Sequence, residues 1–114
     1  MGKDIQVSTS RKGDIAVINI KGDLTAITGS DVNSAYNSCG DIDKMKILLH
    51  FDKDCYINSG GFAFLIDIAS TARRKEQVIR AYGLSDHFQK IFRMIGLTRC
   101  IAVYANEESA LEGF

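Results

Sequence analysis

Alternating apolar and polar residues dominate the first part of the chain, and longer apolar runs follow. Residues 5–10 and 14–22 are rich in β-branched side chains, and a turn-rich step, Arg-Lys-Gly-Asp, separates them. Two such runs joined by a turn predict an antiparallel hairpin. Residues 44–51 form a continuous apolar run of strand length, which is typical of a strand buried on both faces. Shorter runs at residues 77–83 and 100–105 predict two more strands.

Between these strands, apolar residues recur at helical spacing. The pattern predicts helices within residues 23–41, ending near Cys39, and over residues 61–75 and 85–97. A fourth, short helix is expected within residues 106–114, where acidic side chains occupy the first turn. The apolar residues at helical spacing are Ile27, Val32, Ala35 and Tyr36 in the first helix and Phe62, Leu65, Ile66, Ala69 and Ala72 in the second. In the third helix, Leu84, Phe88, Ile91, Phe92 and Ile95 are expected to form the core stripe.

Capping residues mark several helix ends in a chain that contains no proline. Ser85 and Asn106 can each accept a backbone N–H bond at a helix start, and Gly96 can adopt the left-handed conformation that ends a helix, with Leu97 as its apolar contact. The predicted order is β-β-α-β-α-β-α-β-α. Strands that alternate with helices pair in parallel, so we expect an α/β fold with a mostly parallel central sheet and an N-terminal antiparallel hairpin. The length predicts one domain over residues 1–114.

Composition and charge narrow the classes of partner. Fourteen basic residues balance fourteen acidic ones, so we expect neither direct nucleic-acid binding nor membrane association. No apolar run reaches the ~20 residues of a membrane span, and the N-terminus lacks the apolar core of a signal peptide, which predicts a cytoplasmic protein. The basic cluster Arg73-Arg74-Lys75 is interpreted as the solvated end of a helix, with a phosphate-contacting patch as the alternative.

The three cysteines, Cys39, Cys55 and Cys100, are widely spaced and form no Cys-x-x-Cys pair. We interpret them as reduced, small apolar residues. A catalytic cysteine needs a histidine partner, and His50 and His87 are the two in the chain. A small enzyme that uses Cys55 or His50 therefore stays open as an alternative function, which an acidic Cys55 thiol would favour. The sequence contains neither a metal-ligand cluster nor a cofactor fingerprint, so no cofactor is expected.

A corner with the sequence Tyr-Ile-Asn-Ser-Gly-Gly-Phe-Ala-Phe-Leu separates the buried strand from the second helix. Ser59 stands at the expected N-cap position, where a hydroxyl accepts a backbone N–H bond. The pair Gly60-Gly61 is costly in a first helical turn, and bare backbone there indicates close approach of another molecule. The corner lacks the first glycine of a Gly-x-Ser-x-Gly nucleophile elbow and the lysine of a phosphate-binding loop. Ser59 is therefore a candidate phosphate acceptor for a kinase.

The chain resembles the STAS domain over essentially its whole length, and more narrowly the bacterial anti-sigma factor antagonists. The resemblance rests on the element order, the Gly-Asp-Leu sequence after the second strand, the Ser-Gly-Gly turn and the Met-Ile-Gly-Leu sequence near the end. The family motif, typically Asp-Ser-Ser-Gly-Leu, corresponds here to Asn58-Ser59-Gly60-Gly61-Phe62. Ser59 falls on the serine that a partner kinase phosphorylates in the switchable members of the family.

This resemblance implies a function and a set of partners. Such an antagonist binds an anti-sigma factor that is also a GHKL-type serine kinase, and thereby frees the sigma factor. Phosphorylation of Ser59 would switch the antagonist off, and a PP2C-type phosphatase would reset it. The implied partner-binding residues are Asn58, Ser59, Gly60, Gly61 and Phe62 in the turn, with Leu24, Thr25, Ala26, Ile27 and Thr28 beside it.

Several positions depart from the family pattern. Asn58 replaces the acid before the serine, Thr25 replaces an acid near the first helix, and His50 stands where Asp or Asn usually ends the central strand. These changes admit STAS relatives that bind partners without phosphorylation, namely the small subunit of lipid-transport ABC complexes and stressosome scaffolds, in which Ser59 would be only a helix cap. Because Phe62 and Phe64 lie two apart on a helix, they cannot share one face, and one of them is a candidate contact for a partner.

Overall fold

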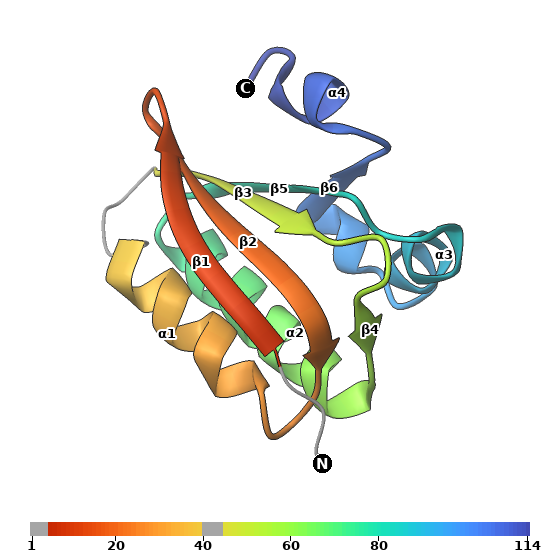
Figure 1. Cartoon of the computed structure of the whole chain (residues 1–114). Helices are drawn as coiled ribbons and strands as arrows, with labels where there is room; N and C mark the ends of the chain where they lie inside the picture. Colours follow the sequence, from red (N-terminus) through yellow and green to blue (C-terminus); the bar gives the residue numbers. More distant parts are fainter. Residues whose placement is uncertain (1–4, 40–44) are drawn as a thin grey trace.

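The computed structural model describes residues 5–39 and 45–114. It begins with the predicted antiparallel hairpin, formed by β1 (Ile5–Lys12) and β2 (Ile15–Leu24). β1 lies at one edge of the sheet and is mostly exposed, whereas β2 lies next to it and carries mainly buried side chains (Figure 1). The apolar alternation of the sequence therefore corresponds to one exposed edge strand and one inner strand.

The remaining strands are β3 (Lys46–Phe51), β4 (Tyr56–Ile57), β5 (Val78–Tyr82) and β6 (Ile101–Tyr104). The main sheet has the order β1-β2-β3-β5-β6, and all its pairs after the hairpin are parallel. The predicted architecture, a mostly parallel sheet with an antiparallel N-terminal hairpin, is confirmed. β4, which pairs in parallel with the end of β2, was not predicted, because two residues are too few to show a period.

The helices are α1 (Gly29–Cys39), α2 (Ser59–Arg74), α3 (Asp86–Met94) and α4 (Glu107–Leu111), with a 3₁₀ turn, η1 (Leu97–Arg99), after α3. Figure 1 shows α1 and α2 side by side across one face of the sheet, with α4 on the opposite side. The predicted caps are confirmed: Ser85 accepts from the N–H of Phe88 and Asn106 from that of Ser109. Gly96 is left-handed, with φ of 80°.

The main core lies between the sheet and the pair α1 and α2. Successive side chains of a strand point to opposite faces, so Ile18 and Ile20 of β2 face this core together with Ile47 of β3. Leu65 and Ile68 of α2 cover them, and all five side chains are at most 1% exposed. Full burial of each such side chain contributes roughly 1.5–3 kcal/mol, so α2 is fixed firmly on the sheet.

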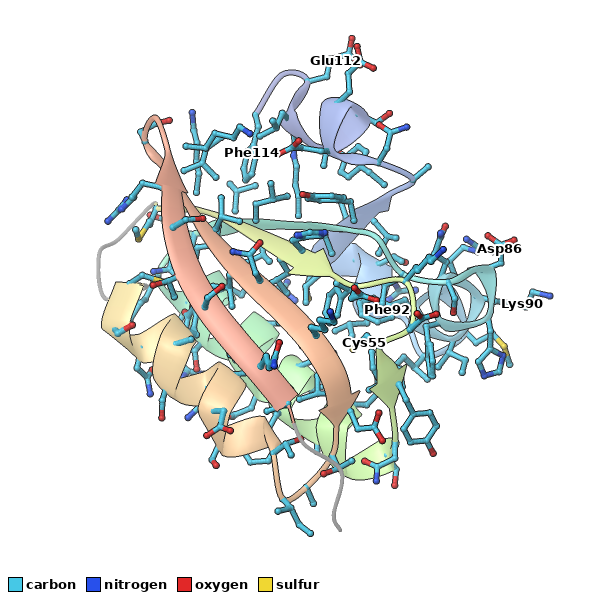
Figure 2. The ribbon with its side chains drawn as sticks, in the orientation of Figure 1. Cys55, Asp86, Lys90, Phe92, Glu112 and Phe114 are labelled. Atoms are coloured by element: carbon cyan, nitrogen blue, oxygen red, sulfur yellow. The ribbon has the colours of Figure 1, made fainter. Side chains whose placement is uncertain are left out.

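A smaller cluster on the other face of the sheet is covered by the C-terminal segment. Val17 of β2 and Leu48 of β3 pack there with Ala110 of α4. The guanidinium of Arg80 donates to the carbonyl oxygens of Ala110 at 3.0 Å and of Glu112 at 2.8 Å, and Figure 2 shows where Glu112 lies in the C-terminal segment. These bonds satisfy carbonyl groups that a short helix leaves unpaired at its end.

Three apolar residues on which the helix predictions rested lie at the surface. Ile27 is 88% exposed, because α1 begins only at Gly29 and Ile27 belongs to the preceding loop. Ile66 is 50% exposed, because α2 turns its other side, with Ile68, toward the sheet. Ile95 is 49% exposed and follows the last residue of α3. The predictions that Ile27 belongs to the first helix and Ile95 to the core stripe of the third were wrong, because a spacing pattern does not show where a helix starts, ends or meets its neighbours.

Candidate functional site

The candidate site lies where β4 leads into α2, and Asn58 begins the helix there. The Asn58 side-chain oxygen accepts the N–H of Gly61 at 2.9 Å, and its carbonyl oxygen accepts the N–H of Phe62 at 2.9 Å. Ser59 is the first residue of the helix and is exposed. The prediction that Ser59 is the N-cap was therefore wrong: asparagine caps as well as serine does, and it occupies the position one residue earlier.

Gly60 and Gly61 bring the start of α2 against the loop between β2 and α1. A Cβ built on Gly60 would lie 2.6 Å from the Cβ of Ala26 and 2.7 Å from its backbone nitrogen. A Cβ on Gly61 would lie 2.1 Å from the carbonyl oxygen of Leu24. Those separations leave no room for a side chain. The two glycines are thus explained by close approach of the chain's own loop, and not by close approach of another molecule as the sequence suggested.

That loop is held by a compact set of hydrogen bonds around two threonines. The Thr28 hydroxyl donates to the carbonyl oxygen of Asp23 at 2.6 Å and accepts the N–H of Thr25 at 2.9 Å. The carbonyl oxygen of Thr25 in turn accepts the N–H of Gly29, the first residue of α1, at 2.8 Å. Ile27 projects from the middle of this loop. A large apolar side chain is therefore displayed on an ordered loop.

The ten residues predicted to bind a partner divide into three groups by exposure. Ser59, Ala26 and Ile27 are exposed, and Asn58, Gly60 and Thr25 are half-buried. The other four, Leu24, Thr28, Gly61 and Phe62, are buried and hold the turn and the loop in place. The structure thus brings the two predicted segments together. It leaves mainly Ser59, Ala26 and Ile27 open to a partner.

Neither Phe62 nor Phe64 is an exposed aromatic contact. Phe62 is 9% exposed and its ring packs against the rings of Phe88 and Phe92. The ring of Phe64 lies where a Cβ on Gly29 would be, so it covers the first turn of α1. The two phenylalanines do point to different sides of α2, as the spacing requires, but each side is occupied by another part of the chain.

Tyr56 on β4 is the exposed aromatic residue of this region, and sequence reasoning missed it. It is 50% exposed, and its register partner on β2 is Asp23, next to the loop. Its ring meets that of Phe88 edge-on, with centroids 6.0 Å apart. The alternation of buried Cys55, exposed Tyr56 and buried Ile57 is a strand signal, but three residues are too few to stand out in a sequence.

The chemistry at Cys55 does not favour the thiol alternative. Burial, reinforced by the nearby carboxylates of Asp23 and Asp52, raises the pKa of the Cys55 thiol to about 12. The thiol is therefore protonated near neutral pH and is a poor nucleophile. Figure 2 shows Cys55 in the interior of the molecule.

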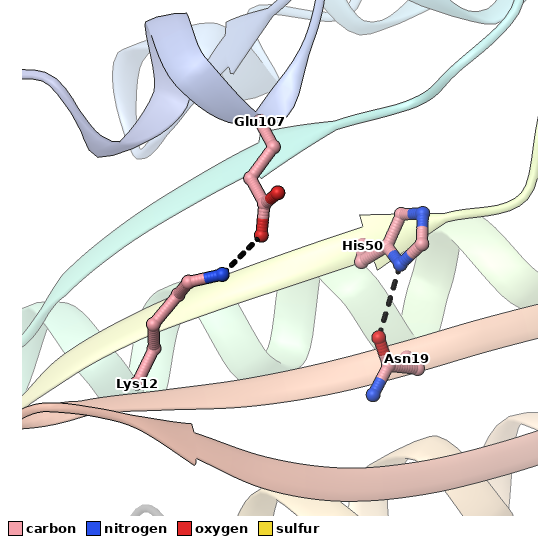
Figure 3. A network of polar contacts seen from close by, with 4 residues as sticks. All are labelled: Lys12, Asn19, His50 and Glu107. Carbon is pink, nitrogen blue, oxygen red and sulfur yellow. Dashed lines mark hydrogen bonds and ion pairs between the residues drawn. The ribbon is translucent and has the colours of Figure 1, made fainter.

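His50 lies on the sheet face that carries α4. Its Nδ1 is 3.0 Å from the side-chain oxygen of Asn19, and its ring stacks on Tyr82 with centroids 4.5 Å apart. Figure 3 shows His50 close to the ion pair between Lys12 and Glu107, whose atoms lie 2.8 Å apart. Within residues 5–39 and 45–114, no three metal-ligating side chains come together.

Comparison with solved structures shows which fold this arrangement belongs to. The chain is similar to an anti-sigma factor antagonist from Mycobacterium paratuberculosis, with a TM-score of 0.76 over 96% of this chain and 92% of that one, at 14% sequence identity. The chain has the STAS fold. The cell fate determinant SpoIIAA of Bacillus, in its phosphorylated form, matches with a TM-score of 0.61 over 96% of this chain and 97% of that one, at 15% identity.

Sequence comparison adds nothing to the assignment of the STAS fold, because neither a family model nor a curated protein matches the chain. The STAS fold places the start of α2 and the β2–α1 loop at one end of the sheet, as Figure 1 shows.

Among the described helices, none is both long enough and apolar enough to span a bilayer.

Proposed function

We propose that this STAS-fold protein is an anti-sigma factor antagonist that binds its anti-sigma factor through Ala26, Ile27, Tyr56 and Ser59, here called the switch surface. Phosphorylation of Ser59 ends the binding. The observation that carries the proposal is the exposed hydroxyl of Ser59, which does not cap its helix and belongs to a turn packed against the loop of Ile27.

Ile27 is the main apolar anchor of the switch surface. Burial of an isoleucine side chain contributes roughly 1.5–3 kcal/mol, and Ile27 enters the interface almost wholly exposed, at 88%. The hydrogen bonds of Thr25 and Thr28 already order its loop, so little conformational entropy is lost when a partner binds. The partner is expected to offer an apolar pocket to Ile27.

A phosphate on Ser59 is expected to act on the interface and to leave the fold intact. It carries about −1.5 to −2 charges, which the positive end of the α2 dipole stabilises. No acidic residue lies in the first turn of α2 to repel it. A hydrated dianion beside Ile27 must, however, be desolvated when the partner docks. A loss of a few kcal/mol lowers affinity about a hundredfold, which is enough to release a partner.

The wider partner set follows from this mechanism. The anti-sigma factor would be the GHKL-type serine kinase that phosphorylates Ser59, a PP2C-type phosphatase would remove the phosphate, and all three would act in the cytoplasm. The phosphorylated form of Bacillus SpoIIAA supports a phosphorylated state for this fold. The alternative of an unswitched subunit for a lipid transporter or a scaffold explained Ser59 as a helix cap, and Asn58 now fills that role.

The test uses the protein recovered from its own cells, together with a Ser59→Ala variant. Intact-mass measurement and phosphosite mapping are expected to find one phosphate, confined to Ser59. Affinity capture with the unphosphorylated wild type is then expected to recover an anti-sigma factor kinase, and capture with unphosphorylated Ile27→Asp is not.

Val78→Asp is the matched control, because Val78 is also a half-exposed apolar residue, 48% accessible, but lies on β5. It is expected to retain the kinase. If Ser59 carries no phosphate under any growth condition, the proposed phosphorylation switch is wrong. Capture of a transporter ATPase in place of a kinase would favour the unswitched alternative.

A further inference from the structure

A second surface lies along the second half of α2, between that helix and the region where α3 passes through η1 into β6. It contains a cavity of about 260 Å³, whose apolar wall includes Ile66, Ala69, Ile95 and Leu97. A second cavity of about 410 Å³ adjoins it, and both are lined by Ala69, Arg73 and Cys100. We call the two together the α2–η1 groove. Because the cavities share a wall, the groove suits an elongated occupant.

The groove exposes large apolar side chains from two different elements. Ile66 of α2 is 50% exposed and Ile95, after α3, is 49% exposed. Single exposed apolar residues are ordinary, but two that line the same cavity from different parts of the chain form one apolar site. Both stand at apolar positions of helical spacing, and the fold leaves each side chain about half exposed.

Arg73 and Arg99 supply positive charge to the groove, and no aspartate or glutamate lines either cavity. Within the described part of the chain, neither arginine forms an ion pair. Arg73 also suits the last turn of α2, where a cation complements the helix dipole. That reason does not extend to Arg99, which belongs to η1 on the other side of the groove. Two unpaired guanidinium groups thus line one apolar groove in a chain of zero net charge.

We propose that the α2–η1 groove binds a segment of a partner protein in which an apolar side chain is flanked by carboxylates. The apolar side chain, of leucine or phenylalanine size, enters between Ile66 and Ile95. The carboxylates pair with Arg73 and Arg99, whose planar guanidinium groups match carboxylate geometry. Nucleic acid fits this groove poorly, because two arginines beside two isoleucines do not form a basic stripe.

This site goes beyond the proposed function, because it is separate from the switch surface. Along α2, Ser59 lies about 10 Å from Ile66 and about 20 Å from Arg73, at 1.5 Å per residue. Neither Ser59 nor Ile27 lines the groove, so a segment confined to the groove leaves both accessible. The protein can therefore hold one partner irrespective of phosphorylation while the other end of α2 is switched.

The test selects peptides from a randomised twelve-residue library against the full chain, with counter-selection against Ile66→Asp. The enriched peptides are expected to carry one leucine or phenylalanine with aspartate or glutamate on either side. Binding of a selected peptide is then measured by titration calorimetry. Amide shifts in a ¹H–¹⁵N spectrum are expected at Ala69, Ser70, Gly96 and Cys100, all of which line the groove.

Two variants with the same charge change show whether Arg73 contributes to binding of the peptide. Arg73→Glu is expected to weaken the peptide at least about tenfold. Arg74→Glu makes the same charge change one residue later, where the guanidinium bonds to Ser70 and Thr71 on its own helix, and is expected to bind nearly as the wild type does. Ile27→Asp, which disables the switch surface, is expected to bind the peptide normally, so the two proposals fail separately.

Three results would overturn the proposal. The first is a selection that enriches no sequence against the wild type over Ile66→Asp. The second is equal binding of a peptide in which lysine replaces each acidic residue. The third is equal weakening by Arg73→Glu and Arg74→Glu, which would assign the effect to overall charge.

Discussion

Gly60 lies against Ala26, and their contact joins the start of α2 to the β2–α1 loop. A Cβ on Gly60 would be 2.6 Å from the Cβ of Ala26 and 2.9 Å from its Cα, so a side chain there must push the loop away. The contact couples the turn of Ser59 to the loop of Ile27. The shape of the switch surface therefore depends on a residue with no side chain.

Gly60→Ala is expected to lower the free energy of unfolding by about 1–3 kcal/mol, because it forces atoms into an occupied space. It is also expected to weaken binding of the proposed anti-sigma factor partner while Ser59 stays in place. Urea unfolding and a binding titration check the two effects. Ser59→Ala, one residue earlier and exposed, is the control and is expected to leave stability nearly unchanged. Equal stability of Gly60→Ala and the wild type would show that the loop is not fixed by this contact.

Asn58→Ala is expected to cost about 1 kcal/mol of stability, because it removes the side-chain oxygen that accepts the N–H of Gly61. Asn58→Asp keeps an oxygen at that position and adds a negative charge at the helix N-terminus, so it is expected to match or exceed the wild type. Thermal unfolding of the three proteins checks the order. If Asn58→Ala is as stable as the wild type, or if Asn58→Asp is as unstable as Asn58→Ala, then the Asn58 side chain does not stabilise α2 as its N-cap.

Ser59→Asp is expected to preserve the fold and raise stability by about 0.3–1 kcal/mol, since its charge meets the positive end of the α2 dipole. Ser59→Lys, a substitution of opposite charge at the same exposed position, is expected to lower stability by a similar amount. Both are measured at low salt, where screening is weakest. Unfolding of the domain by Ser59→Asp would mean that a phosphate acts by melting α2, contrary to the switch proposed above.

The Cys55 thiol is expected to resist alkylation in the folded protein at pH 8 while the half-buried Cys39 and Cys100 react. Its folded pKa is raised from 9.0 to about 12. The stabilisation linked to this proton is fully present below pH 9 and is lost as the pH rises through 12. The difference in unfolding free energy between wild type and Cys55→Ala is therefore expected to shrink over that range. Rapid labelling of native Cys55 would contradict its burial.

The sequence predicted the sheet and its helices because these depend on short-range patterns. Apolar alternation identified the hairpin, and the caps Ser85, Asn106 and Gly96 fall where local backbone chemistry requires them. Patterns of this kind act within a few residues. The two-residue strand β4 is too short for such a pattern, and the N-cap of α2 was placed one residue late because serine and asparagine both cap helices.

The sequence by itself determined the α/β order, the parallel sheet and the candidate corner at Ser59, since hydrophobic period and turn chemistry are local. Tertiary structure alone decided what surrounds that corner. It set Gly60 against Ala26, exposed Ile27 and Tyr56, and buried Phe62 among the rings of α3. It also left Ile66 and Ile95 uncovered beside Arg73. Each of these facts depends on distances between segments far apart in the chain, and those distances are set by how the helices pack on the sheet.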